Sequence, residues 1–215
     1  MLDIHSTIEK AIHRSQPCQR NWDLSQKIPN KDIDLILTAL TQCPSKQNVA
    51  HYKIHAITNR DIIEKIHTHT DGFSISINPY KTITNTQVLA NLLIVIEHFP
   101  VVQDDPVLNI ENFAFTNGDR SEKVLWAVNR DCQQAVGVAA GYANLTASML
   151  GYATGFCSCF SSDPIREILS ASNEILLMIG IGYKNPTLPR RVSHIKHNFI
   201  YPSSLKQPIE IKLHN

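Results

Sequence analysis

Residues 132–162 read CQQAVGVAAGYANLTASMLGYATGFCSCFSS and contain no charged side chain. The spacing of apolar residues predicts a helix from about Arg120 to Leu150, rich in alanine and glycine in its second half. Small side chains let another helix approach closely, so this helix belongs at the centre of the molecule or of a dimer. We expect a buried strand to follow at about Tyr152–Phe160.

The length of this stretch would also suffice to cross a membrane. It carries polar residues such as Asn144 and Thr154, however, and no cluster of Lys or Arg lies at either end. Gly151 and Gly155 indicate a break in the middle. We therefore favour a buried helix followed by a buried strand over a membrane span.

Apolar spacing and capping residues predict further elements on both sides. We expect helices over residues 6–14, 30–43 and 59–66 and from Asp163 onward, and strands at Tyr52–Thr58, Asn91–His98 and Glu174–Gly180. A capping box formed by Ser6 and Glu9 would begin the first helix. The alternation of helices and strands indicates a sheet covered by helices.

The chain has 215 residues, 43% of them hydrophobic, which is enough to form one domain over residues 1–215. Residues near 100–118 are expected to form a long excursion from it. A tail at 203–215 would extend away from the body. Its alternating Ile209, Ile211 and Leu213 suit pairing with the sheet edge of another subunit.

The charge balance argues against nucleic acid and against an anionic membrane surface as partners. Twenty Lys and Arg residues stand against 19 Asp and Glu residues, a net charge of +1, so no general field attracts either one. The five cysteines are an odd count, and the N-terminal residues show no export signal. Both features favour a cytoplasmic protein.

Common cofactor and metal motifs are absent from the sequence. No G-x-G-x-x-G, G-x-x-x-x-G-K-[ST] or H-E-x-x-H pattern occurs, and Gly180-Ile181-Gly182 is only half of a dinucleotide fingerprint. Cys157 and Cys159 have the wrong spacing for zinc, and burial in an apolar strand explains them better. His67 and His69 are more simply loop histidines than metal ligands. We expect no metal site.

Two polar clusters lie where predicted helices end. His13-Arg14-Ser15, with Arg20 beyond it, offers guanidinium groups and a hydroxyl that suit a phosphate monoester. Basic residues at a helix C-terminus can also simply complement the helix dipole. The second cluster, Pro44–Asn48, is a loop rich in donors and acceptors, and by itself it is only a turn.

Taken in order, these segments resemble the nitroreductase-like flavoproteins. Ile12–Trp22 resembles their opening R-R-S-x-R-x-F, and Pro44-Ser45-x-x-Asn48 resembles their P-S-x-x-N. Ala135–Phe160 is similar to their small-residue central helix and the stretch after it. Ile179–Tyr183 and Pro189-Arg190-Arg191 resemble the strand end and basic pair that follow. The resemblance covers essentially the whole chain.

The resemblance implies an FMN-binding α+β fold, with a central mixed β-sheet flanked by helices, in an intertwined homodimer with two flavin sites at the interface. It implies a phosphate site made by Arg14, Ser15, Arg20, Arg190 and Arg191. It also implies ring or ribityl contacts from Ser45 and Asn48 of the partner, a contact of Asn85 with the polar edge of the ring, and backbone groups of Phe156, Cys157 and Ser158 near N5.

The implied activity is an FMN-dependent oxidoreductase that uses NAD(P)H to reduce nitroaromatics, quinones or similar flat acceptors by a ping-pong mechanism. The flavin would carry the chemistry, without a catalytic side chain, and Arg20 would stabilise negative charge near N1 if it does not bind phosphate. Alternatives are a dehydrogenase, a reductive dehalogenase or a flavin-fragmenting enzyme of the same family, and a flavin-binding protein without turnover.

The chain departs from the family pattern at several positions. His13 replaces the first arginine, and Gln16–Gln19 separate Ser15 from Arg20 where the family has one residue. Ala50-His51-Tyr52 stands in place of Q-P-W, and Val88 in place of a lysine that follows the flavin-edge asparagine. These changes affect groups that would contact the flavin, so its affinity or potential is expected to differ.

Overall fold

The computed structural model describes residues 3–71, 85–99, 122–185 and 208–214. The excursion near 100–118, Arg190, Arg191 and residues 203–207 and 215 of the tail lie outside these ranges. The described elements, in chain order, are α1 (Ile4–Ser15), α2 (Asn30–Thr41), the 3-10 helix η1 (Lys46–Asn48), β1 (Tyr52–Ile57), α3 (Arg60–His67), the 3-10 helix η2 (Thr86–Val88), β2 (Leu92–His98), α4 (Glu122–Met149), β3 (Ala153–Cys157), α5 (Ser162–Leu169) and β4 (Ile175–Gly182).

The four described strands form one sheet in the order β1-β2-β4-β3. All three neighbouring pairs are antiparallel, with Ile94 opposite Ala56 on one side and Ile179 on the other. The α+β class is confirmed, but the expectation of a mixed sheet is wrong for these strands. The connections that contain α3 and α5 each join antiparallel strands, whereas α4 leads from β2 to β3, which run in the same direction on either side of β4.

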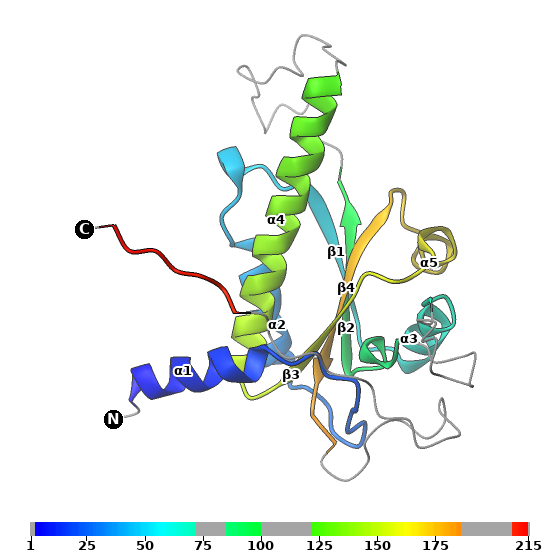
Figure 1. The fold of residues 1–215 in the computed structure, drawn as a ribbon. Coiled ribbons are helices and arrows are strands. Elements are labelled where there is room, and N and C mark those ends of the chain that lie inside the picture. Colours follow the sequence, from blue (N-terminus) through cyan, green and yellow to red (C-terminus); the bar gives the residue numbers. More distant parts are fainter. Residues whose placement is uncertain (1–2, 72–84, 100–121, 186–207, 215) are drawn as a thin grey trace, which may run out of the picture.

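Helices cover both faces of this sheet, α2 and α4 on one side and α3 and α5 on the other (Figure 1). Successive side chains of β2 alternate between the two layers, as strand geometry requires. Leu92, Ile94 and Ile96 belong to the core under α2 and α4, whereas Leu93 and Val95 belong to the core under α3 and α5. The apolar run at 92–96 is therefore explained by burial on both faces.

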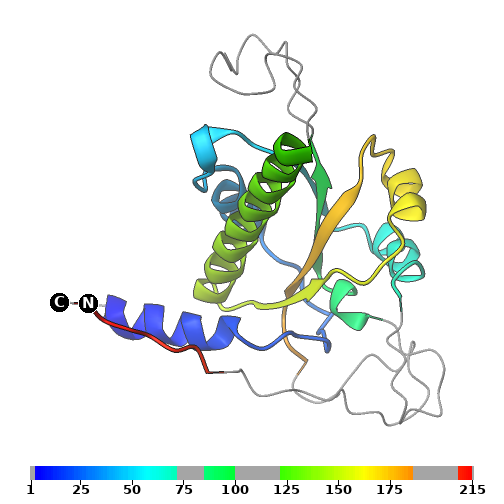
Figure 2. The same cartoon turned by 45° about the horizontal axis from the view of Figure 1, so that its top comes forward.

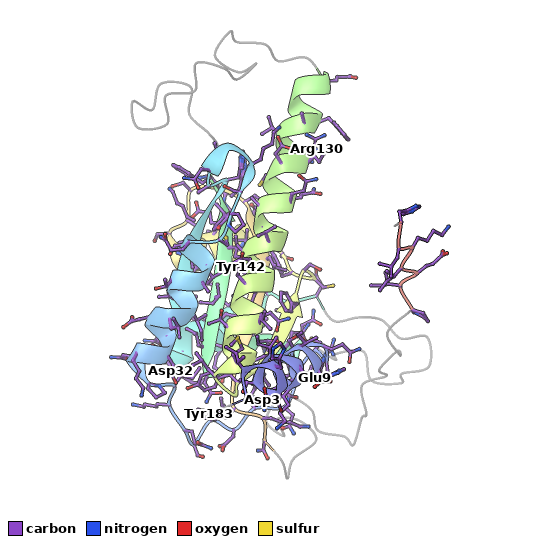
Figure 3. The ribbon with its side chains drawn as sticks, turned by 90° about the vertical axis from the view of Figure 1, so that its left-hand side faces the viewer. Asp3, Glu9, Asp32, Arg130, Tyr142 and Tyr183 are labelled. Carbon is purple, nitrogen blue, oxygen red and sulfur yellow. The ribbon has the colours of Figure 1, made fainter. Side chains whose placement is uncertain are left out.

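Helix α4 is buried on one side and apolar on the other. Ala139, Ala143 and Ala147 are fully buried, as expected for a central small-residue helix. On the outer side Tyr142 and Met149 are nearly half exposed, and Figure 3 shows Tyr142 midway along α4. Among the described residues no helix is both long and apolar enough to cross a membrane.

Local capping explains where the helices begin. Asn59 caps α3 as predicted, because its side chain accepts hydrogen bonds from the amides of Asp61 and Ile62. The cap of α1 is Asp3, whose carboxylate accepts from the His5 amide at 3.1 Å, and not Ser6. The helix thus begins one turn before the capping box that the sequence suggested, and it crosses the end of α4 (Figure 2).

Candidate functional site

Strand β3 lies at an edge of the described sheet, and a loop from α1 runs along its outer side. The amide of Gln19 donates to the carbonyl of Thr154 at 2.7 Å. The thiol of Cys18 lies 3.7 Å from the carbonyl of Phe156. The loop then passes the end of β4, where the Asp23 amide donates to the carbonyl of Tyr183 at 2.8 Å. These contacts bring the chain between Ser15 and Arg20 alongside β3.

Arg14 and Ser15 are fixed where α1, α4 and β3 meet. The guanidinium of Arg14 donates from Nη1 to the carbonyl of Ser148 at 2.9 Å, near the C-terminal end of α4. The Ser15 carbonyl accepts from the amide of Asn144 at 3.2 Å, and Asn144 in turn accepts from the Thr154 hydroxyl at 2.5 Å. Favourable charge at a helix C-terminus explains part of the position of Arg14. Its described partner is a neutral carbonyl, which leaves its charge available for an anion.

Arg20 lies beside η2. The Thr86 hydroxyl donates to the Arg20 carbonyl at 3.0 Å, and the carbonyl of Thr86 accepts from the indole N–H of Trp22 at 2.9 Å. The amide of Arg20 donates to the side chain of Gln19. These bonds hold the backbone on either side of the arginine against the same edge of the sheet.

Asn85 joins the start of η2 to the chain beyond β3. Its side-chain amide donates to the carbonyl of Asp71 at 2.7 Å and to that of Cys159 at 3.0 Å, and the residue is 3% exposed. The predicted contact with the edge of a flavin ring remains a prediction. In this chain the amide N–H groups of Asn85 hold two backbone segments together.

The three residues predicted to face N5 lie at the end of β3 with alternating surroundings. Phe156 packs on the core under α2 and α4, Cys157 is buried in the core under α3 and α5, and Ser158 is exposed. Burial raises the pKa of the Cys157 thiol to about 12. Cys159, by contrast, is exposed, so the interpretation of both thiols as buried strand residues is wrong for Cys159.

Gly155 makes the approach of the loop to β3 possible. A Cβ atom there would collide with the carbonyl oxygen of Gln19 and would lie 2.6 Å from the Cβ of Gln87. Sequence analysis did not assign Gly155, Gln19 or Thr154 to the site. A glycine inside a strand is a signal of close backbone approach, and it was the clue available for Gly155.

Ser45 and Asn48 lie elsewhere on the molecule. The intervening Lys46 forms an ion pair with Asp131 at 2.6 Å, about 25 Å along α4 from Ser148 at 1.5 Å per residue. Burial raises the pKa of Asp131, but hydrogen bonds from Lys46 and Arg130 outweigh it, so the net pKa lies below the usual value. Burial lowers the pKa of the neighbouring His51. Within one chain, the loop of Ser45 and Asn48 therefore lies far from Arg14.

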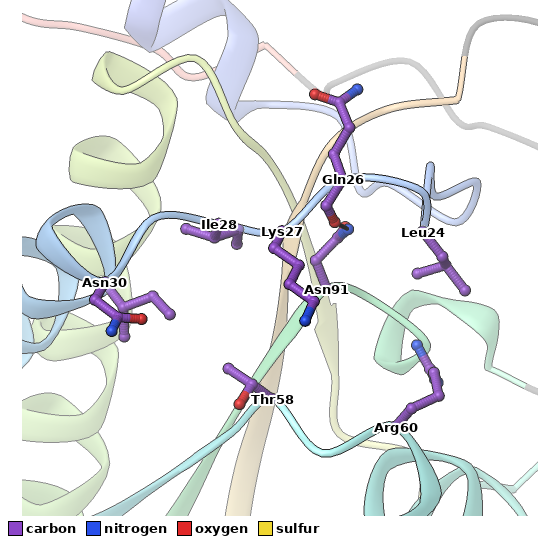
Figure 4. A pocket seen from close by; sticks show the side chains of 9 residues that line it. Leu24, Gln26, Lys27, Ile28, Asn30, Thr58, Arg60 and Asn91 are labelled. Carbon is purple, nitrogen blue, oxygen red and sulfur yellow. Dashed lines mark hydrogen bonds between the residues drawn. The ribbon is translucent and has the colours of Figure 1, made fainter.

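A separate pocket of about 450 Å³ opens between the loop before α2 and the start of α3. Figure 4 shows Lys27, Thr58 and Asn91 around it. The pocket shares no residue with the edge of β3. Among the described residues no group of three potential metal ligands occurs.

Comparisons with known proteins give one family match and a set of structures with a similar fold. The model of the Nitroreductase family matches residues 14–183. No curated protein matches. Similar solved structures are ydfN from Bacillus subtilis, named as a nitroreductase (TM-score 0.66, 16% identity, 95% of this chain and 96% of that chain), a nitroreductase family protein from Streptococcus pneumoniae (0.64, 16%, 94% and 98%) and an FMN-dependent nitroreductase from Clostridium difficile (0.55, 15%, 87% and 97%).

Proposed function

Because the chain belongs to the nitroreductase family, we propose that it is an FMN-dependent oxidoreductase that uses NAD(P)H to reduce nitroaromatics, quinones or similar flat acceptors in a ping-pong cycle. The observation that carries this proposal is that the segment from Arg14 to Arg20 runs along the outer edge of β3 and past η2, where Asn85 holds the turn after the strand. The similar protein from Clostridium difficile is named as FMN-dependent.

The residues present fit a phosphorylated flavin. Arg14 contacts a neutral carbonyl rather than a carboxylate among the described residues, and a guanidinium so placed favours a phosphate. Ser15 follows it directly. Arg190 and Arg191 are expected to add to the phosphate site, and Arg20 to supply positive charge there or near the polar edge of the ring.

When bound, FMN supplies the hydride and electron transfer. The protein's part is to hold it and to leave one face open to a flat substrate. Cys157 is buried at the end of β3 while Ser158 beside it is exposed, so the strand end is anchored in the core and the residue after it faces solvent. Asn85 holds the carbonyl of Cys159 and thereby fixes the same turn.

The proposal includes a homodimer in which Ser45 and Asn48 complete the site of the partner subunit. The distance of this loop from Arg14 within one chain supports that arrangement. A second support is the apolar outer side of α4, where Val138, Tyr142, Leu145 and Met149 are 37–47% exposed. Gly137 and Gly141 lie beside this stripe, and a Cβ at either position would meet no atom within 4 Å. A partner helix would find a close-packing surface there.

A cytoplasmic location is also proposed. All five cysteines are unpaired, as is usual in a reducing compartment.

The test is the absorbance spectrum of the purified protein, followed by anaerobic addition of NADH. We expect a yellow protein with about one FMN per chain, and rapid bleaching. A protein that is colourless as purified and retains no FMN when FMN is added would refute the flavin site. Tight binding with slow bleaching would favour a carrier, and bleaching without reduction of nitroaromatics or quinones would favour a specialised branch of the family.

Arg14→Gln tests the phosphate site directly, with Lys10→Gln on the exposed surface of α1 as the matched control. A hydrogen bond between charged groups contributes about 1.5–3 kcal/mol, so the Kd for FMN should rise roughly tenfold to hundredfold. The control should bind FMN as the wild type does. Equal affinity in all three proteins would remove Arg14 from the site.

A further inference from the structure

Three of the five cysteines gather at the end of β3. The thiol of Cys18 lies 3.7 Å from the carbonyl of Phe156, and the thiol of Cys157 lies 3.7 Å from the carbonyl of Cys159. Cys43 and Cys132 are elsewhere, in the core under α2 and α4. Cys18 is on the segment Gln16–Gln19, which the family pattern lacks, so this chain itself adds a thiol to the strand edge.

The three thiols differ in reactivity. Cys157 is 2% exposed and its pKa is raised to about 12 by burial, so it stays protonated at neutral pH. Cys18 and Cys159 are both exposed. The thiolate is the nucleophile in disulfide chemistry, and a buried thiol that does not ionise is inert. Exchange with a molecule from solution therefore begins at Cys18 or Cys159.

The position of Cys159 is fixed, and that of Cys18 is adjustable. The carbonyl of Cys159 accepts from the Asn85 side chain at 3.0 Å and from the Asp71 amide at 2.9 Å. Residues 16–18 are exposed between anchors at Ser15 and Gln19. Cys18 and Cys159 both also influence the pKa of the Cys157 thiol through their charges, so both lie close to it.

We propose that Cys18 and Cys159 form a reversible disulfide by exchange with a low-molecular-weight disulfide. One of the two thiolates attacks a sulfur of that molecule, forms a mixed disulfide and releases one thiol. The second cysteine then attacks the sulfur of the first, forms the internal bond and releases the second thiol. The two cysteines lose two electrons and two protons in total, and the external disulfide gains them.

Closing this bond draws residues 16–18 toward the end of β3. A disulfide requires Cα atoms within about 7 Å of each other, so the exposed segment moves while the anchored turn at Cys159 stays in place. The bond would lie beside Phe156, Cys157 and Ser158, and its effect on a flavin there rests on the proposed function. Formation of the bond itself needs no cofactor.

The experiment is peptide mapping by mass spectrometry of the full chain after incubation with oxidised glutathione, with and without bound FMN. We expect a peptide that links Cys18 to Cys159, loss of two of the five free thiols in a thiol titration, and full reversal by excess reduced dithiol. Cys18→Ser and Cys159→Ser should each abolish the link. Cys157→Ala should retain it, with circular dichroism to show that each variant is folded.

A mixed disulfide with glutathione that never resolves, a link that includes Cys157, or five unchanged thiols would each overturn the proposal. The result is also separable from the flavin assignment. A colourless protein that forms the link would refute the flavin site alone, whereas a yellow protein without it would refute the disulfide alone.

Discussion

Gly155→Ala tests whether the loop that carries Arg20 can pack against β3 only because position 155 has no side chain. The added Cβ would collide with the Gln19 carbonyl and lie 2.6 Å from the Cβ of Gln87, where carbon atoms normally pack at about 3.5–4.0 Å. Relief requires a movement of roughly 1 Å by the loop or η2. Forced packing of this kind costs about 1–3 kcal/mol.

Other contributions modify that cost. The Gln19 amide would lose its bond to Thr154, worth about 1 kcal/mol, while alanine in a strand recovers about 0.5–1 kcal/mol relative to glycine. We expect a net destabilisation of about 2 kcal/mol in urea unfolding, together with weaker FMN binding. Unchanged stability and FMN affinity in Gly155→Ala would refute the close approach of loop and strand.

Three further predictions concern the buried carboxylate of Glu97, the hydrogen bonds of Asn85 after β3 and the dimer. Burial pushes the pKa of Glu97 upward, but hydrogen bonds from His55 and Asn173 outweigh it, and the net pKa is lowered. Glu97→Gln should therefore lower the free energy of unfolding by about 2 kcal/mol near neutral pH. In urea unfolding, the difference between this variant and wild type should shrink as the pH falls below about 4.5. Asn85→Ala should weaken FMN binding and speed hydrogen exchange at Asp71, with unaltered exchange as the contrary result. Leu145→Lys should shift the protein toward monomer in sedimentation, and the idea fails if the mass stays dimeric.

The sequence allowed correct prediction of elements whose signal is local. The apolar run of β2 and the Asn59 cap of α3 both depend on neighbouring residues, so spacing and residue type were sufficient. Strand order could not be obtained in this way, because side-chain alternation reports which face is buried and not which strand lies alongside. The antiparallel pairing of β2 with β4 depends on a long connection that includes α4.

The sequence predicts which residues form the candidate site, and that assignment stays a prediction, but it does not predict the bonds that hold them in place. The order of motifs indicated Arg14, Ser15 and Asn85, yet each of them also bonds a group far away in the chain: Ser148, Asn144 and Cys159, respectively. Nothing in the local pattern of Asn144 showed that it joins Ser15 to Thr154. Burial of Cys159 was inferred from its strand-like surroundings, but β3 ends at Cys157 and the chain then turns outward.

The length of α4 connects the fold to the proposed dimer. Arg14 contacts the C-terminal end of α4, whereas Lys46 contacts Asp131 in the first half of the same helix. The cluster of Arg14 and the loop of Lys46 are therefore held far apart within one chain. A twofold axis across the apolar outer side of the helix would set two such helices antiparallel and bring the loop of each chain to the arginines of the other. The same exposed stripe that lacks a partner in one chain would then both hold the dimer together and complete its two sites.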